Sequence, residues 1–455
     1  MNAHINARTC PFGLCIAVVA CCFAGGTAAL GQQTGSIEPR TLNLHEAVEL
    51  ALKHNHVVRI ASLHVEEEQH AKEVARSAYL PTIRNDSAFL RVTDTQFIAI
   101  PGGSLGNGVP TQTAVLNQGG KSFTTSGTGL TQPLTELWKI RAGNDVARAD
   151  LNASREKARG VEDEVALRVR QLYYKILIVQ SQHRAIEAKI RAVEELQTER
   201  VQQVKYGSTL EVDLIESRAQ FLQAKQELLT TELQVSDLRM QFNDVVGLPI
   251  KSEVALDPEV ATPTNSCERE QCIRLALDSH PEVTEARAVV EKASAGVRAA
   301  KYEYIPDVEA FARYTYSNDV PFLARNFGTF GVHFSYDLFD GGKKRATLRE
   351  RDSQLAQAKE NLARISDEVE LRVETAYNKV ERTQQMIAVS KELLATRNEA
   401  RRVSAQQLEQ GTYLRSQAEA ADAQELEAQT LLLQSQLEYA QAQDELTDAI
   451  GRTAQ

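Results

Sequence analysis

The chain has 455 residues, and its 51 Lys and Arg against 61 Asp and Glu give a formal net charge of −10, which argues against a protein that binds nucleic acid. A mean hydropathy of −0.33, with no apolar run of about 18 residues beyond residue 25, excludes a polytopic helical membrane protein. All 12 prolines lie outside residues 134–248 and 322–455, so these two stretches, rich in Ala, Gln, Glu, Leu and Arg, predict very long helices.

Residues 1–31 have the composition of a secretory signal peptide. Arg8 precedes an almost wholly apolar segment, residues 11–24, which is too short to span a bilayer, and Ala29-Leu30-Gly31 supplies small residues for cleavage. The competing interpretation is lipoprotein processing, which would leave a lipid on Cys21. Both interpretations predict that the chain leaves the cytoplasm.

The rest of the sequence contains an internal repeat. Tyr79-Leu80-Pro81 recurs as Tyr304-Ile305-Pro306, 225 residues later, whereas matches beyond Leu134, such as Gly207 with Gly411, are 204 residues apart. One deletion of 21 residues between Pro81 and Leu134 explains the change. We expect a first repeat over residues 32–247, an equatorial linker over 248–266, a second repeat over 267–451 and a tail over 452–455.

Each repeat is predicted to hold the same elements in the same order. A first helix, residues 44–79 or 268–304, ends before a proline. Two alternating segments follow, separated by a loop that is long in the first repeat, residues 98–121, and short in the second. A long helix, residues 139–205 or 343–409, is interrupted at Gly207 or Gly411, and a last helix runs to Gly247 or Gly451.

The alternating segments predict strands with one apolar face. Phe330, Val332 and Phe334 point to one side, and His333 and Ser335 to the other. The equivalent positions of the first repeat are less apolar, being Asn85, Ser87 and Arg91. Four strands are too few for a membrane barrel, which needs about eight, and a bilayer does not tolerate open sheet edges. The strands therefore predict an oligomer.

Apolar residues of the predicted helices recur every seven positions, as in Leu348, Leu355, Leu362 and Val369, or in Leu214, Phe221, Leu228, Val235 and Phe242. One such stripe would fit an ordinary core helix, but several stripes in both repeats predict helices that supercoil around partners. A helix of about 67 residues is about 100 Å long. The predicted fold class is mainly α, a long coiled-coil column, with a small β part.

Two cysteines lie outside the leader, Cys267 and Cys272. A disulfide is the natural hypothesis for an exported protein, provided that Cys267 lies before the following helix begins. The alternatives are two free thiols or a metal site, for which no further cysteine is available.

The sequence resembles the TolC-like outer membrane factors, the outer membrane efflux protein family, over residues 42–451. The resemblance rests on Gly331 and the run from Leu338 to Ala346, on Ala51-Leu52 and Ala276-Leu277, on the two Tyr-Leu/Ile-Pro segments and on Tyr206-Gly207 and Gln410-Gly411. Each motif is weak alone, but the ordered set occurs twice.

The resemblance implies a homotrimer in the outer membrane lipid, in which each chain gives four strands to a 12-stranded transmembrane β-barrel and its helices to an α-helical barrel through the periplasm. It implies a passive exit duct of a tripartite efflux or type I secretion system, served by an inner-membrane transporter and a periplasmic adaptor. Pro81 and Pro306 would form the helix–strand bends, and Gly207 and Gly411 the reversals at the tunnel tip.

Members of this family carry an acidic ring just after the tip glycine, and here the equivalent positions are Asp213 and Gln417, with Glu419 and Asp422 nearby. The candidate constriction would attract cations. Because the register differs from the family's, these acids fit ordinary solvated helix faces as well. Tyr413 and Arg415 are further candidates for contacts at the tip.

No catalytic, cofactor-binding or metal motif is found in the sequence. His54, His56, His64 and His70 cluster in the first helix, but His56 and His64, which could share a face, are two turns apart and too distant for one ion. Trp138 fits either an anchor at the bilayer interface or simple packing. We therefore expect no enzyme and no cofactor; the alternative function is an exported periplasmic coiled-coil adaptor or scaffold.

Overall fold

The computed structural model describes residues 41–94, 97–117, 120–258, 267–318, 320 and 324–451. The chain divides into two units, Met1–Arg40 and Thr41–Gln455, and all described residues belong to the second. The predicted signal peptide, Cys21 and the tail 452–455 lie outside the described residues.

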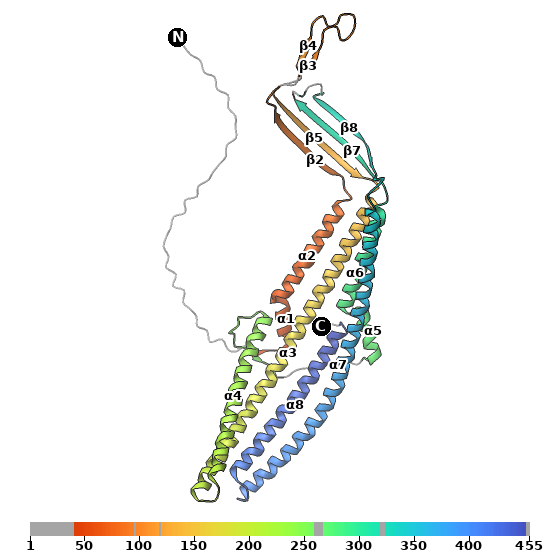
Figure 1. The fold of residues 1–455 in the computed structure, drawn as a ribbon. Coiled ribbons are helices and arrows are strands. Elements are labelled where there is room, and N and C mark those ends of the chain that lie inside the picture. Colours follow the sequence, from red (N-terminus) through yellow and green to blue (C-terminus); the bar gives the residue numbers. More distant parts are fainter. Residues whose placement is uncertain are drawn as a thin grey trace, which may run out of the picture. The chain divides into compact units, whose positions relative to one another are not determined.

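Long helices dominate the described part of the chain, as the proline-free stretches predict (Figure 1). The first repeat holds α1 (Leu44–His54), α2 (His56–Ser77), α3 (Leu137–Lys205) and α4 (Glu211–Val246). The second repeat holds α5 (Arg269–Ser279), α6 (Pro281–Tyr302), α7 (Lys343–Glu409) and α8 (Arg415–Ala449). The helices of the two sets follow the same order along the chain.

The first helix of each repeat is broken, which corrects the continuous helices predicted over 44–79 and 268–304. Asn55 has an extended backbone, accepts a 2.8 Å hydrogen bond from the Val57 N–H and donates to the Val245 carbonyl at 2.9 Å. In the second repeat His280 precedes Pro281, and the proline disfavours helical backbone in the residue before it. Each break therefore arises from the residues at the junction of the two helices, Asn55 in the first repeat and His280-Pro281 in the second, without an intervening turn.

The last glycine of each repeat packs closely against the helix break of the same repeat. Gly247 and Gly451 have φ of 79° and 72°, and a Cβ added to them would lie 2.7 Å from the His54 Cβ and 2.6 Å from the His280 Cα. Glycine is required at both places for its backbone conformation and for this close approach.

Four antiparallel strands form one sheet in the order β2 (Thr82–Arg91), β5 (Ser122–Pro133), β7 (Asp307–Asn318) and β8 (Asn326–Ser335). The central pair β5–β7 joins the two repeats, with Leu130 opposite Ala312. β2 and β8 are the open edges. The four strands predicted from the sequence are thus present and paired.

The two faces of this sheet differ in chemistry. The register places Ile83, Leu130, Ala312 and Phe330 in one row of the first face, which we call the apolar face; Phe89, Val332 and Phe334 belong to it too. The opposite, charged face carries Arg84, Asp86, Glu309, Arg313 and His333. Phe330 is 88% exposed and Val332 64% exposed.

The polar positions of the first repeat lie on the apolar face and bind one another. Asn85 donates to the Thr128 hydroxyl at 2.8 Å, and the hydroxyls of Ser87 and Ser126 are 2.8 Å apart. The weaker alternation of the first repeat therefore corresponds to a polar patch that satisfies its own hydrogen bonds.

The long loop predicted over 98–121 contains a hairpin, which is a second correction. β3 (Phe97–Ile100) pairs antiparallel with β4 (Ala114–Asn117). Its strands are short apolar runs that the surrounding Gly, Thr and Asn conceal in the sequence. The hairpin lies in the stretch by which the first repeat exceeds the second.

A two-stranded parallel sheet closes the equatorial region. β1 (Thr41–Leu42) pairs with β6 (Ala255–Leu256) from the predicted linker. The hydroxyl of the buried Tyr173 on α3 lies 3.0 Å from the Leu42 carbonyl and 2.8 Å from the Asp257 carbonyl. Tyr173 thus ties both strands to the long helix.

The buried apolar residues form two main clusters, the first of which also includes Leu437 and Ala440 of α8. The first centres on α3, with Val169, Tyr173 and Phe242. The second joins α5, α7 and α8 through Cys272, Val369 and Leu446. Among the described residues, no helix combines the length and the apolar character needed to cross a membrane.

Candidate functional site

The two helix–helix turns have nearly the same geometry. Gly207 and Gly411 have φ of 68° and 69°, and the N–H groups that follow them, of Ser208 and Thr412, donate to carbonyls five residues back at 2.8 and 3.0 Å. This is the pattern of a helix that ends on a left-handed glycine. Both turns lie at the same end of the helices, at the bottom of Figure 1.

The candidate constriction residues Asp213 and Gln417 cap the helices that follow the turns. Asp213 accepts hydrogen bonds from the Thr209 hydroxyl at 2.6 Å and from the Leu210 N–H at 3.3 Å. These bonds hold the pKa of its exposed carboxyl below the usual value. Gln417 makes the equivalent bond to the Leu414 N–H at 3.3 Å. In both repeats, therefore, the side chain six positions after the glycine accepts a hydrogen bond at the start of the following helix.

The other two candidates differ from each other. Asp422 binds Arg401 of α7, with Oδ1 2.8 Å from Nε, and the buried Glu425 lies 2.9 Å from the same guanidinium. This pairing occupies Asp422 within the α7–α8 hairpin. Glu419 is half-buried on α8. The structure brings neither acid into one cluster with Asp213 within a single chain.

A contact joins the two hairpins near the turns, and it includes the tip candidate Arg415. Glu199 of α3 accepts hydrogen bonds from the N–H and the hydroxyl of Ser416, in the first turn of α8, and Arg415 lies 3.6 Å from Glu195. A carboxylate at a helix N-terminus is favoured by the free N–H groups there. We call this contact the hairpin clamp; a single Glu on a long charged helix gives no sequence signal for it.

The helix–strand bends contain the predicted prolines. Pro81 and Pro306 directly precede β2 and β7. The Thr135 hydroxyl donates to the Pro306 carbonyl at 2.7 Å and accepts from the Val308 N–H at 2.8 Å, while Lys139 binds Asp307 at 2.6 Å. The start of α3 is thereby fixed to the bend of the other repeat.

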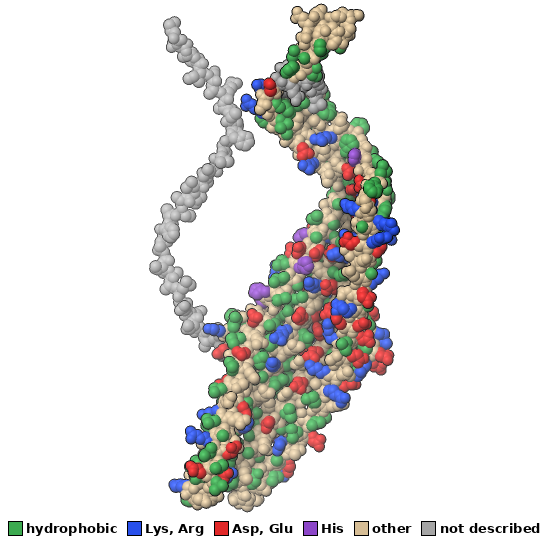
Figure 2. Space-filling view, in the orientation of Figure 1, with side chains coloured by type: hydrophobic (Ala, Val, Ile, Leu, Met, Phe, Trp, Pro, Cys, Tyr) green, Lys and Arg blue, Asp and Glu red, His purple; other side chains and the backbone are tan. Residues whose placement is uncertain are grey.

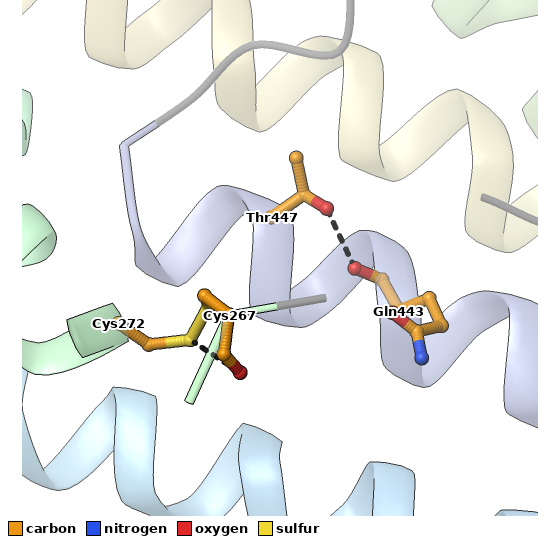
Figure 3. The surroundings of a disulfide bond; sticks show 4 residues. All are labelled: Cys267, Cys272, Gln443 and Thr447. Atoms are coloured by element: carbon orange, nitrogen blue, oxygen red, sulfur yellow. Dashed lines mark hydrogen bonds between the residues drawn. A yellow bond between two sulfur atoms is a disulfide. The ribbon is translucent and has the colours of Figure 1, made fainter. Parts of the chain in front are cut away.

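The equatorial region holds the cysteine pair, shown in Figure 3. Cys267 and Cys272 form a disulfide with a Cα–Cα distance of 5.7 Å, and Cys267 precedes the start of α5, as a bridge requires. Cys272 is fully buried beside α7 and α8. The bridge fixes the end of the linker on the second repeat.

Buried acids lie where α8 crosses α3. Asp444 accepts a 2.6 Å hydrogen bond from the Tyr174 hydroxyl and lies 3.3 Å from Arg170. Burial raises the pKa of Asp444 and, one turn on, raises the pKa of Asp448 to about 6, where Asp163 adds repulsion. The sequence does not distinguish these residues, because acidic side chains are frequent along the helices (Figure 2), and only the packing of the helices covers Asp444 fully and Asp448 in part.

Two of the four clustered histidines, His64 and His70, lie beside glutamates of α2. His64 lies 3.1 Å from Glu67, and His70 lies 3.3 Å from Glu73. Within the described ranges no group of three or more His, Cys, Asp or Glu is placed to hold a metal ion.

Comparison with known families and structures agrees with this geometry. The model of a family described as outer membrane efflux protein matches residues 47–247 and 272–452. No curated protein matches significantly.

Several solved structures are similar. A membrane protein from Pseudomonas aeruginosa is 16% identical, with 91% of each chain covered and a TM-score of 0.71. The Campylobacter jejuni CmeC outer membrane channel is 15% identical over 90% of this chain and 85% of its own, with a TM-score of 0.72. VceC from Vibrio cholerae is 14% identical over 90% and 96%, with a TM-score of 0.71. At these identities the likeness shows the fold, and it confirms the predicted fold class.

Proposed function

Because the chain belongs to the outer membrane efflux protein family, we propose that it is the exit duct of a tripartite export system, a passive channel that receives its substrate from an inner-membrane transporter through a periplasmic adaptor. The family locates the protein in the outer membrane and makes it a channel component. The tripartite assembly, efflux as against type I secretion, and the trimer belong to the proposal.

One observation carries the proposal: the four-stranded sheet has two open edges and an exposed apolar face. β2 and β8 each have one strand neighbour, and Phe330 and Val332 are largely exposed in the single chain. A sheet with unpaired edges is not stable in a bilayer, but three copies joined edge to edge would make a closed barrel of 12 strands. The apolar face would then contact lipid and the charged face the lumen.

We propose the same arrangement for the rest of the chain. Residues 1–31 would be the export signal, with a lipid on Cys21 as the alternative, and residues 248–266 the equatorial linker between the repeats. The turns at Gly207 and Gly411 would form the periplasmic tip that faces the adaptor and transporter.

The test is single-channel conductance of the purified full chain in planar bilayers, with its native mass measured in detergent. We expect a trimer with discrete pores. A water-soluble monomer or dimer without conductance would contradict the channel and favour the periplasmic scaffold.

The candidate constriction is tested in the same bilayers. We propose that Asp213, Glu419 and Asp422 give the tip its preference for cations. Asp213→Asn, Glu419→Gln and Asp422→Asn should each lower the ratio of cation to anion permeability. Glu67→Gln, at an exposed position of α2, is the control. If none of the three substitutions changes the selectivity, these acids do not form the constriction, but the proposed duct still stands.

A further inference from the structure

Helix α4 carries an apolar stripe that nothing in the described chain covers. Its members follow heptad spacing and are between 40% and 69% exposed: Val212, Ile215, Leu222, Leu229, Leu233 and Met240. The opposite side of α4, with Ala224 and Leu238, is buried where the helix packs on α3. A seam of this kind on a helix is typical of a missing helical neighbour.

The equivalent stripe on α8, 204 residues later, is covered by α3. Ser416 binds Glu199, the hydroxyls of Thr430 and Ser181 are 3.0 Å apart, and Asp444 binds Tyr174. Leu437, the equivalent of Leu233, is 4% exposed. The exposed face of α4 therefore corresponds to a face of α8 that is buried or half-buried.

The repeat also identifies what would cover α4. Since α7 is the equivalent of α3, the residues of α7 that correspond to Glu199 and Ser181 are Val403 and Gln385, and both are exposed. α7 packs against α5, α6 and α8 in its own chain, so this side of it is available. The contact Ser416–Glu199 becomes Val212–Val403 in the equivalent position.

Charged residues of α2 and α7, in the part of these helices nearer the four-stranded sheet, support a contact between α7 and the first repeat of another copy. In the chain, Arg298 of α6 lies 3.0 Å from Asp145 of α3. The equivalents are Glu73 of α2 and Arg349 of α7, both exposed, and both signs are reversed. Likewise the hydrogen-bonded pair Thr284–Glu156 becomes Arg59 and Glu360. The charges on α2 and α7 are therefore complementary.

We infer that α2 and α4 of one copy of this chain pack against α7 of a second copy, with Val212 against Val403 near the turns and Glu73 against Arg349 near the sheet. This between-copy seam rests on the proposed trimer and specifies its contacts. The equivalent contact within one chain is that of α6 and α8 with α3. The two contacts differ in chemistry, because apolar residues of the between-copy seam stand where the hairpin clamp lies within the chain.

Charge reversal tests the upper part of the seam. Glu73→Arg and Arg349→Glu should each lower the temperature at which half of the detergent-solubilised trimer dissociates, and the double variant should restore it. Glu67→Arg, at an exposed position on another side of α2, is the matched control and should neither weaken the trimer nor rescue Arg349→Glu. A double variant no more stable than the single ones would contradict the pairing.

Cysteine cross-linking tests the lower part. Val212→Cys with Val403→Cys should form disulfides between chains on mild oxidation, giving dimer and trimer bands on a denaturing gel. Val212→Cys with Leu408→Cys, which lies on another side of α7, should not.

The outcomes separate this inference from the proposed function. A conducting trimer that fails both tests would overturn the seam and leave the duct. A protein that is a monomer by mass and does not conduct would overturn both.

Discussion

At the scale of single residues, glycines at the helix ends are required for two different reasons. Gly207 and Gly411 have left-handed backbone in open space, with no atom within 4 Å of an added Cβ. Gly247 and Gly451 combine the same backbone with the close approach to the helix breaks described above. The two kinds should respond differently to alanine.

Gly207→Ala should lower the free energy of unfolding by about 1 kcal/mol, the conformational cost of a left-handed alanine. Gly247→Ala should lower it by more, because the methyl group also meets the His54 backbone at 3.3 Å. Gly143→Ala, inside α3 and in open space, is the control and should be neutral or stabilising. Thermal unfolding of the three variants checks the order; equal effects at residues 207 and 247 would contradict it.

Asp448 should make the protein less stable as the pH rises. Its folded pKa of about 6 lies above the ordinary value of 3.8, so the folded state binds the proton more tightly, and the stability present below about pH 4 is lost between pH 4 and 6. The loss corresponds to roughly 2 to 3 kcal/mol.

Asp448→Asn should remove this loss. We expect a higher melting temperature than the unmodified protein at pH 8 and little difference at pH 4. A variant that is destabilised equally at both pH values would show that the carboxylate is held by favourable contacts instead.

At the scale of elements, the hairpin clamp should keep the first turn of α8 closed. Glu199→Ala removes the acceptor for the Ser416 N–H, so hydrogen exchange should become faster in residues 414–418 and stay unchanged at the start of α4. Glu194→Ala, at an exposed position five residues earlier on α3, is the control. Unchanged exchange at Ser416 would contradict a stabilising role for the clamp.

The disulfide should stabilise the junction of linker and α5. Because it closes a short loop, its loss should lower the free energy of unfolding by about 2 kcal/mol. Thermal unfolding with and without a reductant measures the effect, and Cys267→Ser with Cys272→Ala should be insensitive to the reductant. An unmodified protein equally insensitive would contradict this role.

The elements could be predicted from the sequence largely because each occurs twice, once in each repeat, so that a weak pattern in one copy is supported by the other. The long helices and the four strands follow from missing prolines and from alternation, both of which are local signals. The break at Asn55 is harder to predict, because the local cap that Asn55 provides for Val57 is joined by a bond to Val245, a contact from another helix.

The site was harder to predict for the same reason. Asp213 was found by its distance from Gly207, but its capping bonds require the backbone geometry of the turn. On α4, the heptad of Leu214, Phe221 and Leu228 was recognised, whereas the stripe of Val212 and Leu233 on the opposite side was not. Glu199 and Asp448 depend on contacts between repeats, which no local pattern contains.

At the scale of the whole molecule, the two faces of the sheet should tolerate charge differently. Val332→Lys adds a charge to the apolar face, where lysine at mid-membrane costs about 2–4 kcal/mol. His333→Lys, the neighbouring residue on the charged face, is the matched control. We expect the first variant to be reduced in the outer membrane fraction and to lose heat-modifiable migration, and the second to resemble the unmodified protein. Equal tolerance would contradict the assignment of lipid and lumen faces.

The internal repeat has a consequence for how such a wall can change during evolution. In the proposed trimer, six similar hairpins surround the axis, and the joints between them alternate between two amino-acid sequences, one inside each chain and one between chains. A single mutation therefore reaches only every second joint. Mutations can therefore weaken the three joints of one kind, while the three joints of the other kind keep their residues and hold the ring together.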